Sequence, residues 1–131
     1  LGARAADVVV VVDEALPRVD ADAGLLERAL ANVIANAITA TPPEQPVRVV
    51  AGRAGDRVDI RVADHGPGVT AEESTRMFVP FQRLGDASAG EGVGLGLAVA
   101  RGFVESMGGV LEVEETPGGG LTMVFSLRVA S

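Results

Sequence analysis

Four glycines at alternating positions precede an apolar-periodic stretch of the chain. They are Gly90, Gly92, Gly94 and Gly96, and the stretch covers residues 99–107. Glycine backbone is flexible and exposes its amide N–H groups, and the first turn of a helix carries partial positive charge. This combination favours the binding of an anion, above all a phosphate chain. The alternative is a glycine hinge without a ligand.

A polar stripe runs along a helix that we expect from Ala23 to Ala40. Four side chains fall within about 60° of one another on that helix: Arg28, Asn32, Asn36 and Thr39. The oxygens of two carboxamides four residues apart can converge on one point, and Mg2+ accepts such neutral oxygens beside water and phosphate. The alternative is a polar helix face turned to solvent.

A carboxylate stands where an alternating strand gives way to a turn. Val58, Ile60 and Val62 share one face of that strand, and Asp64 extends the same face before the glycine-flanked turn 65–68. A buried carboxylate needs hydrogen-bond donors. The exocyclic amino group of a purine would supply one, while the glycines let a flat ring approach the backbone. The alternative is an Asp that caps its own turn.

Four other residues near these segments are candidates for a catalytic, anchoring or ligand-binding role. His65 is the only histidine, and we expect it to be an exposed loop residue rather than a catalyst. Phe78 and Phe81 precede a small, polar, glycine-bearing segment, residues 84–92, which we expect to be a mobile loop. Both rings should anchor that loop, with ligand contact as a secondary role. Arg83 either reaches a phosphate when the loop closes or is a free surface arginine.

Several common sites are excluded by their missing motifs. No Gly-Lys-Ser/Thr follows a glycine loop, so the chain has no P-loop. The glycines do not follow a strand in the G-x-G-x-x-G register, which argues against a Rossmann dinucleotide site. Neither a Ser/His/Asp arrangement nor a His-rich metal cluster is present in the sequence.

The elements that must position these residues follow from periodicity and turn signals. β-Branched residues 8–12 predict a buried strand, and Asp22 is the expected N-cap of the helix Ala23–Ala40, which Pro42 ends. The other expected elements are strands at 47–51, 57–63, 110–114 and 121–129, and helices at 71–78 and 93–107. This order predicts an α+β fold with a largely antiparallel sheet covered by helices on one side.

Length and composition limit the class of protein. The 131 residues are 47% hydrophobic, enough for one domain with its own core, residues 1–131. The chain has no Cys, which fits a reducing compartment. No apolar run approaches the ~18 residues of a membrane span, and no signal peptide opens the chain. Because the first residue is not Met, we expect an excised piece of a longer protein.

The charge balance narrows the partners. The net charge is −7, with 18 acidic against 11 basic residues, so nucleic acid is an unfavourable partner. A polyphosphate would be repelled by the same field. A divalent cation is therefore expected to bridge an acidic domain and a phosphate chain.

In their order along the chain, these segments resemble the catalytic ATP-binding domain of sensor histidine kinases, whose Bergerat fold is shared with gyrase, Hsp90 and MutL. The similar segments are residues 30–37 (N box), 64–68 (D-x-G-x-G of the G1 box), 77–81 (F box), 92–97 (G2 box) and 116–122 (final glycine motif). The likeness covers nearly the whole chain. Residues 81–86 and 114–120 look most like the KdpD subgroup, which senses potassium status.

The resemblance implies a fold and a ligand. The fold would be a two-layer α/β sandwich, with a mixed sheet of about five strands covered on one face by about three helices. The ligand would be ATP with Mg2+, with Asn36 binding the metal, Asn32 assisting and Asp64 reading adenine. The remaining predicted nucleotide-binding residues are Thr39, Gly66, Gly68, Phe81, Arg83, Gly92, Val93, Gly94, Leu95, Gly96, Leu97 and Thr122.

Two departures from the related ATPases bear on the reaction. ATP-hydrolysing relatives place a Glu four residues before the metal-binding Asn, where this chain has Asn32. An amide cannot act as a general base, so ATP should be held for transfer rather than hydrolysis. The family usually carries a basic residue and then an aromatic or His where this chain has Thr39 and Ala40. One alternative is therefore a degenerate interaction module with little or no ATP binding. A gyrase-type ATPase is the other, and Asn32 disfavours it.

The implied function is that of a histidine kinase catalytic domain. It would bind Mg-ATP and donate the γ-phosphate to a histidine outside this chain, on a helical dimerisation hairpin of the same kinase. Because that histidine is absent, this piece alone should bind nucleotide without autophosphorylation. A response regulator would be the downstream partner. The expected location is the cytoplasmic part of a membrane-anchored bacterial sensor, with no membrane insertion by this segment.

Overall fold

The computed structural model describes residues 8–13, 15–42, 45–66, 93–116 and 119–130, with the backbone alone for residues 93–96. These residues form one five-stranded sheet with the strand order β1-β2-β3-β5-β4. The strands are β1 (Val8–Val12), β2 (Val47–Ala54), β3 (Arg57–Ala63), β4 (Val110–Glu115) and β5 (Leu121–Arg128). Only β1 and β2 pair in parallel, and the other pairs are antiparallel.

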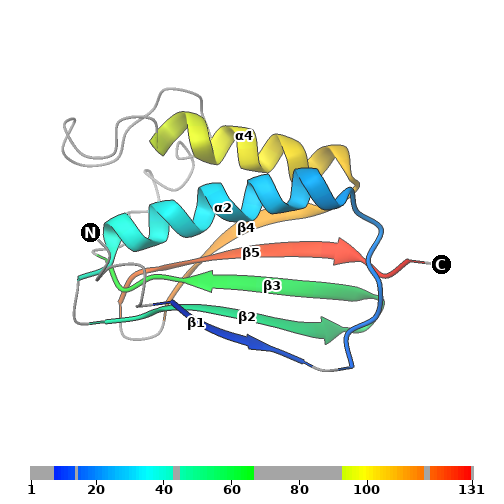
Figure 1. Ribbon diagram of the computed structural model, residues 1–131, viewed down its shortest axis with the longest axis horizontal. Helices are drawn as coiled ribbons and strands as arrows, with labels where there is room; N and C mark the ends of the chain where they lie inside the picture. Colours follow the sequence, from blue (N-terminus) through cyan, green and yellow to red (C-terminus); the bar gives the residue numbers. More distant parts are fainter. Residues whose placement is uncertain (1–7, 14, 43–44, 67–92, 117–118, 131) are drawn as a thin grey trace.

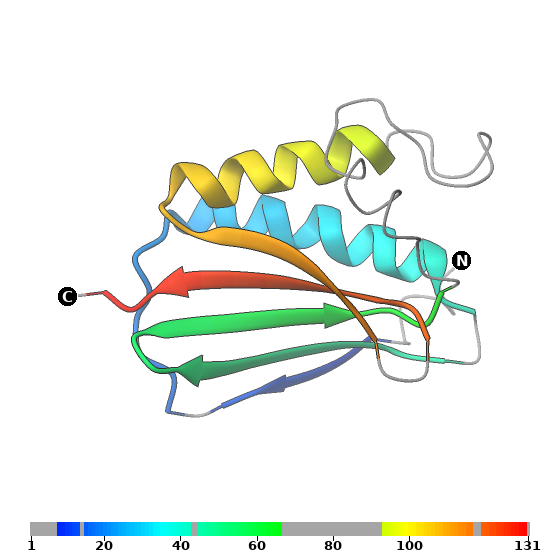
Figure 2. The same ribbon diagram turned by 180° about the vertical axis from the view of Figure 1, so that it is seen from behind.

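Two helices lie side by side on one face of the sheet (Figures 1 and 2). They are α2 (Ala23–Ala40) and α4 (Val93–Ser106). The mixed, mostly antiparallel sheet with helices on one face confirms the predicted two-layer α+β fold. The expected helix 71–78 and the expected loop 84–92 lie outside the described residues, so the structure describes two of the about three expected helices.

The core lies between the helix layer and the sheet. Helix α2 buries residues spaced four apart, Ala29, Val33 and Ala37, as an amphipathic helix requires. From the sheet, β5 contributes most, and Phe125 is fully buried. The other buried members of this core are Val47, Val49, Val62, Leu97, Ala100, Val104, Leu111, Met123 and Leu127. As expected from a chain without Trp or Tyr, aliphatic side chains make nearly all of the contacts.

Both ends of α2 follow the sequence prediction. Asp22 Oδ1 accepts a hydrogen bond from the Leu25 amide at 3.0 Å, so Asp22 is the N-cap. At the other end Thr41 takes an extended conformation, with φ −91 and ψ 134. Proline restricts the residue before it to such extended conformations, so Pro42 ends the helix as predicted.

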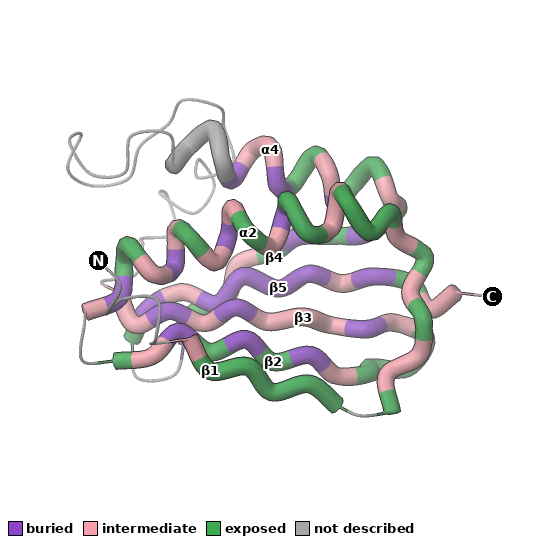
Figure 3. The backbone as a smooth tube through the Cα atoms, in the orientation of Figure 1, coloured by how far each residue is buried: buried purple, intermediate pink, exposed green. Residues whose placement is uncertain are grey.

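Strand β1 forms where predicted, but the expectation that it is buried is wrong. Val8 is half-buried, whereas Val9–Val12 are exposed, up to 61% at Val10. The cause is its place at the edge of the sheet, beyond the strands that the helices cover (Figure 3). A run of β-branched residues therefore indicates a strand and leaves its burial open.

The remaining boundaries differ from the expected ones by a few residues. Strand β2 continues to Ala54 and leaves a two-residue turn, Gly55 and Asp56, before β3. Gly55 takes φ 65, a left-handed conformation that suits this tight hairpin. At the far end of α4, Gly108 also has a positive φ of 78, in agreement with the predicted C-terminal glycine signal.

Candidate functional site

The predicted site residues gather at one end of the molecule. Strand β3 ends where β5 begins, because the two are antiparallel and Ala63 pairs with Thr122. Helix α2 ends, and α4 begins, at this same end (Figure 1). The last turns of α2, the residues after β3 and the first turn of α4 are thus brought together from distant parts of the sequence.

Asp64 is held at this end by main-chain hydrogen bonds. It is 9% exposed, and its backbone N–H donates to the Leu121 carbonyl at 2.8 Å. Its Oδ1 accepts from the amides of Leu121, at 2.9 Å, and of Gly66, at 3.0 Å. The second oxygen, Oδ2, receives no hydrogen bond from the described residues. Asp64 thus caps its own turn, as the simpler alternative expected, and one of its oxygens accepts no hydrogen bond within the described part of the chain.

Two glycines let the backbone pack closely around Asp64. A Cβ on Gly120 would lie 2.3 Å from the Asp64 carbonyl oxygen, and φ at Gly120 is 107. A Cβ on Gly66 would lie 2.8 Å from the carbonyl oxygen of Ala40, in the last turn of α2. Neither position has room for a side chain. The turn after β3 is therefore seated between the end of α2 and the start of β5.

The two asparagines of α2 are half-buried. The Asn36 amide nitrogen, Nδ2, is completely buried and has no hydrogen-bond partner in the described part of the chain. Thr39 is exposed, and its hydroxyl donates to the Ala35 carbonyl at 3.1 Å. Arg28 is also exposed. Of the predicted polar stripe, Asn36 is thus the member with an unsatisfied buried group.

Thr122 lies differently from the other predicted residues. It pairs with Ala63, so strand alternation directs its side chain away from the face that carries Asp64. Its hydroxyl lies 2.9 Å from the Thr116 hydroxyl, and both residues are buried. The structure does not bring this hydroxyl to Asp64. Its neighbour Leu121 lies beside Asp64 instead.

The predicted phosphate-binding segment is described only in part. Helix α4 begins at Val93, as expected, so Gly94, Leu95 and Gly96 lie in its first turn. Leu97 is 4% exposed and belongs to the core. Four other predicted residues lie outside the described residues: Gly68, Phe81, Arg83 and Gly92.

Sequence reasoning missed one polar residue that joins α2 to the turn after β3. Thr41 is 4% exposed, and its Oγ1 accepts a hydrogen bond from the His65 amide at 3.0 Å. His65 itself is half-buried, so the expectation of an exposed loop residue is wrong. The reason is that its backbone is fastened to the end of α2. A hydroxyl directly after the expected helix was the only signal in the sequence.

Two further findings concern metals and membranes. Among the described residues, no group of three or more His, Cys, Asp or Glu side chains could hold a metal ion. No described helix combines the length and the apolar character that crossing a membrane requires.

Comparison with known proteins gives the family. Residues 21–131 match the family model of the histidine kinase-, DNA gyrase B- and HSP90-like ATPases. The chain is 52% identical over 131 residues to the sensor protein KdpD of Rathayibacter rathayi, and covers 15% of that protein. It is 57% identical over 107 residues, 82% of this chain, to KdpD of Mycobacterium tuberculosis (strain CDC 1551 / Oshkosh), and covers 12% of that protein.

Solved structures agree with this assignment. The mycobacterial sensor histidine kinase MprB superposes with a TM-score of 0.83 at 29% identity, over 95% of this chain and 86% of that one. Full-length ShkA in complex with AMPPNP superposes with a TM-score of 0.78 at 30% identity, over 95% of this chain and 26% of that one. The fold, the family model and the relatives agree, and the chain belongs to the histidine kinase-, DNA gyrase B- and HSP90-like ATPases as a catalytic domain of the sensor histidine kinase type.

Proposed function

We propose that this domain binds Mg-ATP and donates the γ-phosphate to a histidine on a separate helical hairpin of a KdpD-like sensor kinase. The observation that carries the proposal is the pair of unused polar atoms at one end of the fold. Among the described residues, Asn36 Nδ2 is buried without a hydrogen-bond partner, and no donor reaches Asp64 Oδ2. A buried donor without an acceptor costs about 1–3 kcal/mol, so a ligand acceptor would be stabilising there.

Asp64 is suited to read a purine. Its Oδ1 is fixed by two main-chain donors, so the carboxylate cannot rotate freely. Its Oδ2 then offers one acceptor in a set direction, which matches a single exocyclic amino group. A bond to a charged acceptor contributes about 1.5–3 kcal/mol, enough to favour adenine over a base that presents a carbonyl there.

The phosphates and the metal would be held by α2 and α4. Asn36 would bind Mg2+ through its carboxamide oxygen, with Asn32 one turn away assisting. The first N–H groups of α4 have no partners within the helix and would face the phosphate chain. When bound, Mg-ATP supplies the phosphoryl group, and its metal ion neutralises part of the charge on the phosphates. The net charge of −7 makes that neutralisation necessary.

Transfer is favoured over hydrolysis by the residue at position 32. Asn32 is half-buried on the same helix face as Asn36. Its amide cannot remove a proton from water. The contribution of this domain would therefore be positioning and charge stabilisation, which phosphoryl transfer requires more than covalent chemistry.

The partners follow from the family. The acceptor histidine would stand on the dimerisation hairpin of the same kinase, and a response regulator would receive the phosphate. The domain would act in the cytoplasm as part of a membrane-anchored sensor. The solved structure of ShkA with AMPPNP, at 30% identity, supports nucleotide binding by a relative of this fold.

Titration calorimetry with AMPPNP, with and without Mg2+, tests the proposal. We expect binding that is strengthened by Mg2+ and lost in Asn36→Ala. If no heat of binding were measured at millimolar nucleotide, the result would instead support the interaction module. The observation that favours this module is that the Thr39 hydroxyl donates to a carbonyl of its own helix. Steady phosphate release from ATP that Asn36→Ala abolishes would support a hydrolase.

A further inference from the structure

We propose that Thr41 is a positioning residue that fastens the Asp64 turn to the end of α2, and so sets the place of the adenine-reading carboxylate relative to Asn36. The inference rests on the proposed function for its consequence. Its structural part, the link between helix and turn, stands on the contacts of Thr41 alone. Thr41 is not a catalytic residue, because it acts through the backbone of the turn.

Thr41 forms hydrogen bonds with both segments that it joins. Its backbone N–H donates to the carbonyls of Ala37, at 3.1 Å, and Ile38, at 3.3 Å, and so completes the last turn of α2. Its side chain points into the fold and is 4% exposed. There Oγ1 accepts from the His65 amide at 3.0 Å. Thr41 is five positions after Asn36, so this anchor lies just over one helical turn from the predicted metal ligand.

The backbone amides of the three described residues of the turn, Asp64, His65 and Gly66, donate to three different acceptors. The Asp64 amide donates to β5, at the Leu121 carbonyl, and the Gly66 amide donates back to Asp64 Oδ1. The His65 amide, between them, donates to Thr41. Among the described residues, this hydrogen bond joins the turn to a side chain at the end of α2. Loss of the Thr41 acceptor would therefore leave a part-buried donor in the middle of the turn.

Close packing holds the turn on two sides, against the end of α2 at Gly66 and against the start of β5 at Gly120. Gly66 lies close to Ala40, because a Cβ on Gly66 would be only 2.8 Å from the Ala40 carbonyl oxygen. Movement away from α2 is opposed by the hydrogen bond between His65 and Thr41. Asp64 stays bonded to Leu121 of β5 without that bond. The end of α2, which carries Asn36, would then be held less firmly to the turn, and the distance between Asn36 and the Asp64 carboxylate would vary more. Because binding of a base depends on the carboxylate position, a small displacement lowers affinity.

The test compares two substitutions at the same position. Thr41→Val keeps the shape of the side chain and removes the acceptor oxygen, whereas Thr41→Ser keeps the oxygen and removes a methyl group. Two quantities are measured in the wild-type chain and in each variant. They are the dissociation constant for AMPPNP with Mg2+ and amide hydrogen exchange at His65 without nucleotide. Exchange at amides of β5, such as that of Phe125, reports the integrity of the fold.

The wild-type His65 amide should be protected without nucleotide. Thr41→Val should lose that protection while Phe125 stays protected, and should bind AMPPNP about tenfold more weakly. Thr41→Ser should keep both the protection of the His65 amide and the wild-type affinity for AMPPNP. Wild-type affinity in Thr41→Val, or equal loss in Thr41→Ser, would overturn the inference. An unprotected His65 amide in the wild type would do so even if Thr41→Val fails to fold. No binding of AMPPNP by the wild type would count against the proposed function, while exchange at His65 would still decide whether Thr41 holds the turn.

Discussion

At the scale of single residues, Asp64 carries two tasks on two oxygen atoms. Oδ1 joins the turn to β5, whereas Oδ2 accepts no hydrogen bond from the described residues and is the atom that we propose for the ligand. Under the proposed function, one side chain would contribute to stability and to recognition through different atoms. Substitutions that change one oxygen at a time should separate the two effects.

Asp64→Asn is the substitution that separates them. The Asn side chain keeps one acceptor oxygen for the amides of Gly66 and Leu121, but replaces the other with an NH2 donor that faces the purine amino group. We expect AMPPNP affinity to fall at least about tenfold, with a loss of unfolding free energy of about 1 kcal/mol. Asp64→Ala removes both acceptors and should cost about 2–3 kcal/mol. Calorimetry and urea denaturation measure these quantities, and equal destabilisation by the two changes would contradict the division of tasks.

Gly120 offers a second prediction at this scale. Both Gly120 and Gly55 have positive φ values, 107 and 65, but only Gly120 lies against Asp64, where a Cβ would meet a backbone oxygen at 2.3 Å. Gly55→Ala should cost about 1–2 kcal/mol from the backbone conformation alone. Gly120→Ala adds a steric clash and should cost more, about 3 kcal/mol or above. Similar urea midpoints for the two variants would show that the turn can open around Gly120 without loss.

At the scale of elements, local signals predicted the described helices and strands well but did not predict how far a strand is buried. Asp22 and Pro42 fixed both ends of α2, because capping and the restriction before proline act within a few residues. The exposure of β1 depends on which strands the helices cover, and that is set by contacts between segments far apart in the chain.

The same distinction applies to the site. Asn36 and Asp64 were predicted from their own segments. The helix α2 that carries Asn36 and the strand β3 that precedes Asp64 end at the same side of the fold. The roles of Thr41 and Leu121 arise only after α2, β3 and β5 meet, since the register Ala63 to Thr122 decides which neighbour lies beside Asp64. The predictions for Gly68, Phe81, Arg83 and Gly92 lie on segments outside the described residues and stay predictions.

A pair of matched substitutions tests the correction to β1. Val10 is 61% exposed on the edge strand, and Val62 is fully buried on the central strand β3. Val→Thr keeps the shape and adds a hydroxyl, so the cost depends on burial. Val62→Thr should lower the unfolding free energy by about 1–3 kcal/mol, whereas Val10→Thr should change it by at most about 0.5 kcal/mol. Urea denaturation decides. A cost at Val10 equal to that at Val62 would mean that β1 is covered in solution.

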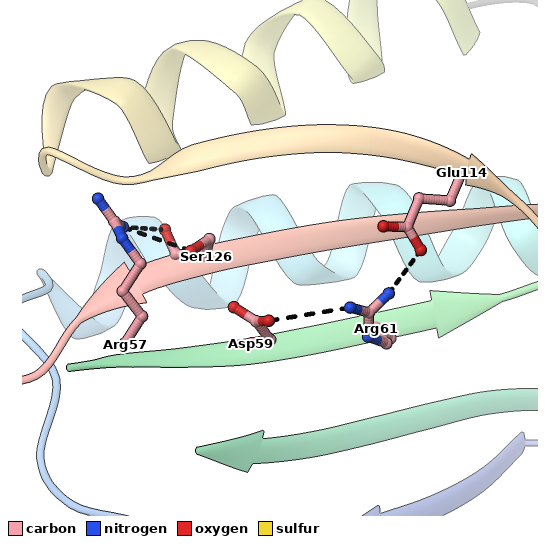
Figure 4. A network of polar contacts seen from close by, with 5 residues as sticks. All are labelled: Arg57, Asp59, Arg61, Glu114 and Ser126. Carbon is pink, nitrogen blue, oxygen red and sulfur yellow. Dashed lines mark hydrogen bonds and ion pairs between the residues drawn. The ribbon is translucent and has the colours of Figure 1, made fainter. Parts of the chain in front are cut away.

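At the scale of the whole molecule, the two faces of the sheet are stabilised in different ways. The face toward α2 and α4 is apolar, and the opposite face carries a polar network (Figure 4). In it Arg61 of β3 reaches Glu114 of β4 at 2.6 Å and Asp59 at 3.8 Å. The strand between them is β5, where Val124 pairs with Arg61 and is only 5% exposed. We infer that this valine, which lies on the face without helices, is covered by the side chains of the polar network around it.

Arg61 should therefore stabilise the sheet through its apolar stem more than through its charge. The Arg61 and Glu114 side chains are 42% and 52% exposed, and exposed ion pairs contribute only about 0–1 kcal/mol. Arg61→Met keeps a stem over Val124 and loses the charge, so it should cost about 0.5 kcal/mol or less. Arg61→Ala uncovers Val124 and should cost about 1–1.5 kcal/mol. Urea denaturation at low and at 1 M salt distinguishes the two contributions, because salt screens the ion pair and leaves apolar packing in place. If Arg61→Met lost as much as Arg61→Ala at low salt, and the loss vanished at high salt, the ion pair would be the stabilising element and the covering of Val124 would not.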